Sequence, residues 1–249
     1  MRVAIHQPNF FPWIGFFQKI QKADLFIVLD HVQASTKQSW LTRNRIRDRV
    51  GARWLTAAVK RRGRYGERIV DVEFDSRHKP LARIAKTLQI VYGRSPEFSS
   101  FRSLIWPVLE VDAQSVSSFN QEVNQRVLGY LDIQPSIIRS SDIVTRHSRF
   151  EGLSGNQLLL ALCQHVEATV YLSGTGSMDY INPPSFEESG IQFVFVEALE
   201  KGYPQLGAGF IPRLSATDLI LNVSQKAARE AARLGVVRDW HESELLPLR

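Results

Sequence analysis

The amino-acid sequence predicts an α/β fold with a Rossmann-like, mostly parallel sheet and a helical insertion. Short apolar, β-branched runs recur along the 249 residues, as buried parallel strands require. Segments with apolar residues at helical spacing separate these runs. The stretch 79–133 carries helical patterns only. We therefore expect a single α/β domain over residues 1–249, with a helical insertion or subdomain around 79–133.

The first elements form a βαβ unit followed by a basic segment. Residues 2–6 and 24–29 predict two buried strands with a short helix between them. Residues 34–52 are polar and basic without a clear period, so we expect a loop. Two strands, 54–59 and 68–74, flank a glycine-containing turn and predict a hairpin.

Helices and a second α/β stretch follow. Pro80 fits the first turn of a helix that continues to Tyr92 and stops at Gly93. The spacing predicts further helices over 97–110, 114–131, 155–165, 215–222 and 224–234, and strands over 137–141, 169–172 and 191–196.

The composition limits the class of protein. Hydrophobic residues make up 44% of the chain and aromatic residues 10%, enough for a packed core. A single cysteine, Cys163, excludes an internal disulfide framework and a cysteine-rich zinc site. The histidines show no metal-ligand spacing, so we expect no metal and no cofactor. No secretory leader or membrane-spanning apolar run is apparent, and we expect a cytoplasmic protein.

Positive charge is concentrated in one segment. The chain has a net charge of +6, yet ten basic residues and a single acidic residue lie between Lys37 and Arg64. Such a local field suggests an anionic partner: a phosphate, a nucleotide or a nucleic acid. A solvated surface loop is the alternative interpretation.

Polar side chains end the two strands of the βαβ unit. His6 ends the first strand and Gln7 follows it, while Asp30 and Gln33 follow the second. Ligands of open α/β sheets bind outside the carboxyl ends of the strands, so we expect a small-molecule site there. His6 suits a general base or a phosphate donor. A structural histidine bonded to neighbouring backbone remains possible.

Two later segments add candidate residues. Ser173 and Gly174 begin a Ser-Gly-Thr-Gly-Ser turn after a strand, which favours an anion-binding nest, and Asp179 and Tyr180 follow it. The turn lacks the lysine of a P-loop, and a plain tight turn is the alternative. The Gly/Pro-rich segment from Tyr203 and Gln205 to Ser215 is long enough for a lid.

The basic segment also contains aromatic residues. Its polar and aromatic cluster comprises Lys37, Trp40, Arg43, Asn44 and Arg45. Arginine forks bind phosphate or carboxylate, and tryptophan can stack on a base or sugar. The same mixture suits single-stranded nucleic acid. No recognised nucleic-acid motif is present, which disfavours that partner.

Several of these motifs together resemble the WbqC-like family. They are the run from Ile5 to Gly15, Leu29 to Gln33, Arg43 to Ile46, Tyr171 to Gly174 with Asp179-Tyr180, Tyr203 to Gln205, and Leu214 to Leu219. The resemblance implies a bacterial protein from surface-polysaccharide (O-antigen) or specialised-metabolite gene clusters. At the level of fold, the chain also resembles nucleotidyltransferases of the pantothenate-synthetase kind. However, the segment Pro12 to Phe16 lacks the two histidines of their nucleotide-activating motif.

We therefore expect a group-transfer enzyme acting on an anionic small molecule. A nucleotide sugar or a carrier-bound acyl group fits best, with N-acyl or aminoacyl transfer to an amino sugar as the reaction. His6, Asp30 and Asp179 are the candidate catalytic residues. The candidate substrate-binding residues are Gln7, Gln33, Lys37, Trp40, Arg43, Asn44, Arg45, Ser173, Gly174, Tyr180, Tyr203 and Gln205. The alternative is a non-catalytic nucleotide- or RNA-binding protein on a degenerate nucleotidyltransferase scaffold.

Overall fold

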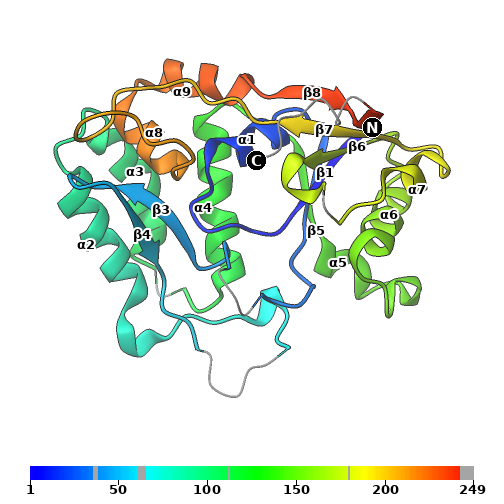
Figure 1. Ribbon diagram of the computed structural model, residues 1–249. Coiled ribbons are helices and arrows are strands. Elements are labelled where there is room, and N and C mark those ends of the chain that lie inside the picture. Colours follow the sequence, from blue (N-terminus) through cyan, green and yellow to red (C-terminus); the bar gives the residue numbers. More distant parts are fainter. Residues whose placement is uncertain (36–38, 61–65, 112, 179, 242–249) are drawn as a thin grey trace.

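A mostly parallel sheet organises the computed structural model, which describes residues 1–35, 39–60, 66–111, 113–178 and 180–241 (Figure 1). In this part of the chain the sheet has six strands in the order β5-β2-β1-β6-β7-β8. All neighbours are parallel except β8, which runs antiparallel to β7. The strands are β1 (Arg2–His6), β2 (Leu25–Val28), β5 (Ser136–Arg139), β6 (Val170–Gly174), β7 (Gln192–Glu197) and β8 (Val236–Asp239).

Helices cover both faces of this sheet. Alternate strand residues point to opposite faces, so Ala4 and Leu172 belong to one core and Val3 and Ile5 to the other. The first core is shared with α1 (Ile14–Ile20), α4 (Val116–Tyr130), α8 (Ala216–Asn222) and α9 (Gln225–Arg233). The second is shared with α5 (Ser140–Val144), α6 (Gly155–His165) and α7 (Pro183–Glu187).

One long connection between β2 and β5 carries the remaining elements. It contains an antiparallel hairpin, β3 (Arg43–Arg47) with β4 (Ala52–Thr56), and then α2 (Pro80–Tyr92), α3 (Phe98–Leu109) and α4. The hairpin, α2 and α3 lie together at the left of Figure 1, and α4 stands between them and the sheet. Short 3₁₀ turns occur at Ile69–Asp71, Ser76–His78, Ser148–Phe150 and Thr175–Ser177.

The predicted fold class, an α/β fold with a Rossmann-like and mostly parallel sheet, is confirmed. The predicted helices after Pro80 and the strands around β1, β2, β6 and β7 are confirmed as well. None of the described helices has the length and hydropathy of a membrane span.

The predicted hairpin of 54–59 with 68–74 is wrong. Residues 52–56 pair instead with Arg43–Arg47, which we expected to be loop, and residues 68–74 contain a 3₁₀ turn and isolated bridges. The β3 sequence has Ile46 as its only apolar residue. Its buried polar side chains, Asn44 and Arg47, are satisfied by distant segments, which the local pattern does not reveal. Strand β8 and helices α5 and α7 were also not expected.

The strand order defines where the chain reverses direction across the sheet. From β1 it moves outward to β2 and β5, then returns to the other side of β1 to form β6 and β7. This is the doubly wound order 3-2-1-4-5, in which the switch point lies between the first and fourth strands. The expected ligand crevice is therefore at the carboxyl ends of β1 and β6.

Candidate functional site

The carboxyl ends of β1 and β6 separate from each other at the switch point. The two strands pair over residues 2–4 with 170–172 and no further. Beyond that, β1 still pairs with β2 through His6, and β6 still pairs with β7 through Gly174. The last residues of the two central strands are therefore not paired with each other. We call the region at these strand ends, where doubly wound folds bind their ligands, the switch-point crevice.

His6 lies at this crevice beneath α1. Its ring meets the edge of Phe16 with centroids 5.2 Å apart. Its Nδ1 lies 3.0 Å from the carbonyl oxygen of Gln7, which can only accept, so Nδ1 carries the hydrogen and Nε2 keeps a lone pair. Burial, with a smaller contribution from Lys19, lowers the pKa of His6 to about 3. The imidazole is thus neutral and presents Nε2 as a base.

Lys19 of α1 is a buried cation at the same crevice. Its side chain is 5% exposed, and its Nζ donates to the carbonyl oxygen of Ile5 at 3.1 Å. The carbonyl of His6 accepts from Leu29 on the β2 side. Because successive strand carbonyls alternate in direction, the Ile5 carbonyl faces β6. Burial lowers the pKa of Lys19 to about 7.

Gly174 leaves room on the β6 side of the crevice. Continuing the strand register beyond Leu172 brings it opposite His6, and a Cβ added to it would meet no atom within 4 Å. Ser173 points to the other face, where its hydroxyl lies 2.6 Å from that of Ser177. The Ser177 hydroxyl also donates to the Gly174 carbonyl at 2.9 Å, so the serines stabilise the turn after β6.

Gly15 allows α1 to lie close to the end of β7. A Cβ at this position would be 2.4 Å from the Trp13 ring and 2.7 Å from the Cβ of Ala198. Any larger residue would push the helix away, together with Phe16 and Lys19. The close approach therefore shapes the crevice.

The β3–β4 hairpin presents a surface of guanidinium and indole groups. Arg43 stacks on Trp54, with its guanidinium carbon 4.3 Å from the ring centre, and the Trp40 and Trp54 rings are 5.7 Å apart. Both tryptophans are nearly half exposed. Within the described chain, the Nε atoms of Arg43 and Arg45 are buried without a hydrogen-bond partner. Cation and aromatic ring together suit a planar or anionic ligand.

This hairpin is attached to the carboxyl edge of the sheet. Asn44 donates to the carbonyl of Phe11 at 2.8 Å, in the loop that follows β1. Arg45 donates to the carbonyl of Arg213 at 3.2 Å, and the backbone N–H of Arg213 donates to Glu200 at 2.8 Å. Glu200 follows β7, and burial raises the pKa of its carboxyl. Asn44 is thus buried and serves the loop, whereas Arg43 and Arg45 remain partly exposed.

Asp30 is fully buried and already has its hydrogen bonds. Its Oδ1 accepts from the backbone N–H of Ser141 at 2.9 Å and from the hydroxyl of Ser140 at 3.2 Å. Its Oδ2 accepts from the hydroxyl of Ser141 at 3.1 Å. The carboxylate thus ties the end of β2 to the first turn of α5.

Tyr203 and Gln205 belong to a polar network under their own loop. The hydroxyls of Tyr203 and Tyr92 donate to the two oxygens of buried Asp218, at 2.9 and 2.7 Å. Gln205 accepts from Arg47 at 3.1 Å, and Arg47 also donates to the carbonyl of Ala208 at 2.5 Å. These contacts fix the segment 203–213 against the hairpin.

The remaining predicted residues are spread along the edge. Gln7 is partly exposed beside His6, whereas Gln33 and Tyr180 are exposed. Gln33 forms an isolated bridge with Arg68, on the β2 side of the sheet. Lys37 and Asp179 lie outside the described residues.

Comparison with known proteins gives one consistent result. The model of the WbqC-like protein family matches residues 7–230. The chain belongs to this family. It is also similar to the Mycobacterium tuberculosis (strain ATCC 25618 / H37Rv) protein named Uncharacterized protein Rv1507c, with 31% identity over 228 residues, 91% of this chain and 95% of the relative. No solved structure gives a significant match.

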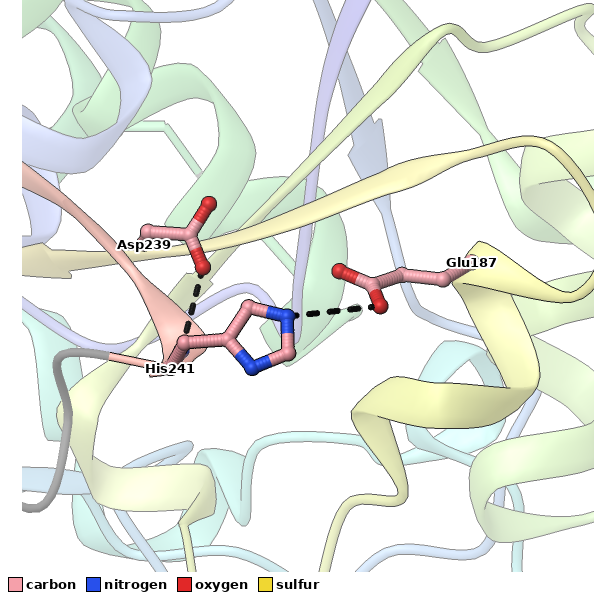
Figure 2. A group of neighbouring side chains, drawn as sticks. All are labelled: Glu187, Asp239 and His241. Carbon is pink, nitrogen blue, oxygen red and sulfur yellow. Dashed lines mark hydrogen bonds and ion pairs between the residues drawn. The ribbon is translucent and has the colours of Figure 1, made fainter.

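One group of side chains in this WbqC-like protein is close enough to suggest a metal site. Within the described ranges, possible ligand atoms of Glu187, Asp239 and His241 lie within 4.8 Å of one another. Figure 2 shows His241 between the carboxylates, with Nε2 3.6 Å from Glu187 and its backbone N–H donating to Asp239 at 3.0 Å. Asp239 pairs with Val194 near the start of β7, so the group lies away from the crevice. We assign it to surface ion pairing.

The sequence interpretation missed Lys19 and Glu200. Lys19 follows the apolar stretch of α1, and a lysine among buried residues is the signal that could have revealed it. Glu200 has no comparable local signal, because only the path of the loop after β7 brings it to Arg213 and near Arg45.

Proposed function

We propose that this WbqC-like protein is a group-transfer enzyme that acts on an anionic small molecule in the switch-point crevice. A nucleotide sugar or a carrier-bound acyl group is the substrate class we favour. N-acyl or aminoacyl transfer, in surface-polysaccharide or specialised-metabolite biosynthesis in the cytoplasm, is the reaction. The observation that carries the proposal is the neutral His6, whose Nε2 lone pair is left free beside the buried Lys19.

His6 is the proposed general base. Its Nε2 would take a proton from the acceptor amine as that amine attacks the acyl carbon of a thioester donor. The carbon–sulfur bond of the donor would then break, and the leaving thiolate would take the proton back from Nε2. A histidine with a pKa of about 3 is a weak base in the free protein, because burial and a neighbouring cation oppose its charge. An anionic substrate would offset the cation and raise the basicity of the ring. Substrate binding would thus activate the base.

Other residues are proposed to bind or to position. Arg43 and Arg45 hold anionic or planar parts of the substrate, with Trp40 and Trp54 as the stacking surface. Asp30 is assigned a positioning role, because both of its oxygens are engaged by the start of α5. Tyr203 and Gln205 are assigned to holding the loop 203–213.

The proposal is tested by turnover with defined substrates. A nucleotide-linked amino sugar is incubated with a panel of thioester acyl donors, and the N-acyl product is measured by mass spectrometry. His6→Gln should lower the turnover rate by roughly 10²–10⁴-fold, as expected for loss of a general base. The matched control is His78→Gln, an exposed histidine on a surface turn. Equal turnover by both variants would contradict the assignment.

The hairpin surface supports a second candidate, a nucleotide- or RNA-binding protein without catalysis. Exposed Trp40 and Trp54 beside Arg43 resemble the stacking surfaces that bind single-stranded nucleic acid. This candidate predicts binding with a steep salt dependence that weakens in Arg43→Ala. Binding of a labelled oligoribonucleotide without turnover of any donor would favour it. Turnover without RNA binding at low salt would exclude it.

A further inference from the structure

The positive charge of Lys19 is buried with few protein groups near it that could neutralise or solvate it. Among the described residues its one hydrogen bond is to the carbonyl of Ile5, which lies just beyond the last residue of β1 that pairs with β6. In the described part of the chain no carboxylate pairs with it. His6 faces it from β1, while the register partners Gly174 of β6 and Val196 of β7 carry no charge. Glu197, which ends β7, is paired with Arg238.

Burying such a charge is unfavourable. A lysine this deep is normally paired, because removing an ammonium from water costs several kcal/mol per ion. One neutral carbonyl offsets only part of this, since a hydrogen bond to a charged group contributes about 1.5–3 kcal/mol. An apolar residue would serve packing better. The cation therefore suggests a partner that arrives from outside.

The space for such a partner is next to the ammonium. The Ile5 carbonyl directs Nζ to the β6 side of β1, and the position above Gly174 on that side is open. Lysine has three N–H donors, and the carbonyl uses one of them. The Phe16 ring closes the crevice on the α1 side of His6. An oxyanion of phosphate or carboxylate size could accept hydrogen bonds from the two remaining N–H groups of Lys19.

We propose that Lys19 forms an oxyanion-binding subsite in the switch-point crevice and that the anionic group of the substrate binds there beside His6. This subsite rests on the proposed function only for the identity of its ligand, because anion binding requires no turnover. Phosphate and carboxylate groups share the required chemistry. In the occupied state the anion, rather than the protein, neutralises the ammonium.

Occupation of the subsite would also change the basicity of His6. The charge of Lys19 lowers the pKa of His6 in the empty crevice, and a bound anion would cancel that effect. His6 would then be a stronger base when substrate is bound than when the crevice is empty. In Lys19→Met the same pKa should rise, although burial, its larger cause, would still hold it below 6.5.

Binding of sulfate tests the subsite directly. Sulfate keeps one charge state between pH 6 and 9, and acetate serves as the carboxylate probe. By isothermal titration calorimetry, Lys19→Met should weaken sulfate binding at least tenfold at pH 6. Lys22→Met is the matched control, since Lys22 lies just beyond the same helix and contacts the carbonyl of Arg233. It should bind as the wild type does.

The pH dependence of sulfate affinity identifies Lys19 as the group that binds the anion. Because the pKa of Lys19 is about 7, wild-type affinity for sulfate should fall severalfold from pH 6 to pH 8.5. Lys19→Arg should keep the affinity and lose this dependence, since arginine remains charged. His6 is neutral throughout this range. If acetate alone binds in a Lys19-dependent manner, the ligand group is a carboxylate; if sulfate alone does so, it is a phosphate.

The outcomes separate this inference from the proposed function. Equal sulfate and acetate affinity in the wild type, Lys19→Met and Lys22→Met would overturn the subsite, even if His6→Gln abolished turnover. Lys19-dependent anion binding with full turnover in His6→Gln would overturn the proposed catalytic role and leave the subsite intact. A folded state of each variant is verified by circular dichroism, and Lys19→Arg supports the conclusion if Lys19→Met does not fold.

Discussion

The ends of β1 and β2 look alike in sequence and differ in structure. Both place a polar, titratable residue after a buried strand: His6 in one case and Asp30 in the other. At the end of β2 both carboxylate oxygens of Asp30 have donors from α5. At the end of β1 the lone pair of His6 and the ammonium of Lys19 lie at a gap in the sheet. Unsatisfied polar groups distinguish the candidate site from a structural junction.

The largest stability effect is expected at the β2 end. Asp30→Ala should lower the free energy of unfolding by about 2–4 kcal/mol, because it leaves the buried donors of Ser140 and Ser141 without an acceptor. His6→Gln should change it by less than about 1 kcal/mol. Urea denaturation measures both. A His6 variant as unstable as the Asp30 variant would show that the two ends are both structural.

Replacing Lys19 should stabilise the protein. Lys19→Met exchanges a buried charge for an apolar side chain and should raise the free energy of unfolding by about 1–3 kcal/mol at pH 6. The pKa of Lys19 is about 7 in the folded protein and about 10.4 in the unfolded chain. The unfolded state therefore binds more protons between these values, and wild-type stability rises with pH there.

The stability gained in Lys19→Met should consequently shrink between pH 7 and pH 10. Denaturation curves at several pH values supply the measurement. A Lys19→Met protein that is less stable at pH 6 would mean that the hydrogen bond to the Ile5 carbonyl outweighs the buried charge. Lys19 would then have a structural role, as Asp30 does, and would not belong to the candidate site with His6.

The loop network should respond like the β2 end, but more weakly. Tyr203→Phe removes one donor to buried Asp218 and leaves the donor from Tyr92 in place. We expect a loss of about 1 kcal/mol in the free energy of unfolding. Thermal unfolding monitored by circular dichroism gives the value. An unchanged stability with a large loss of ligand affinity would move Tyr203 into the binding site.

The smallest stability effect is expected at Gly174. Gly174 has ordinary extended backbone angles, and its added Cβ meets no atom within 4 Å, so Gly174→Ala should alter stability by no more than about 0.5 kcal/mol. The bulkier Gly174→Val should also weaken sulfate binding by filling the open space. Calorimetric titration of both variants reports the difference. Unchanged sulfate affinity in Gly174→Val would place the anion elsewhere.

Much of the architecture could be predicted because it is encoded locally. The apolar runs of β1, β2, β6 and β7, and the helical spacing after Pro80, indicate the α/β class without tertiary information. The hairpin could not be predicted, since β3 is mostly polar and its buried Asn44 and Arg47 depend on residues far away along the chain. The sequence also places candidate residues at the carboxyl edge of the sheet, which stays a prediction, and it did not reveal the buried Lys19.

The sequence by itself determined which strands form and that polar residues follow them, because the period of apolar side chains is a local property. Only the tertiary structure decided which of those residues find hydrogen-bond partners within the protein. Asp30 meets the first turn of α5, more than a hundred residues further along the chain, and becomes structural. His6 and Lys19 meet a place where β1 and β6 separate, which depends on strand order and on the close approach of α1. The candidate site is the place where folding left such groups without partners.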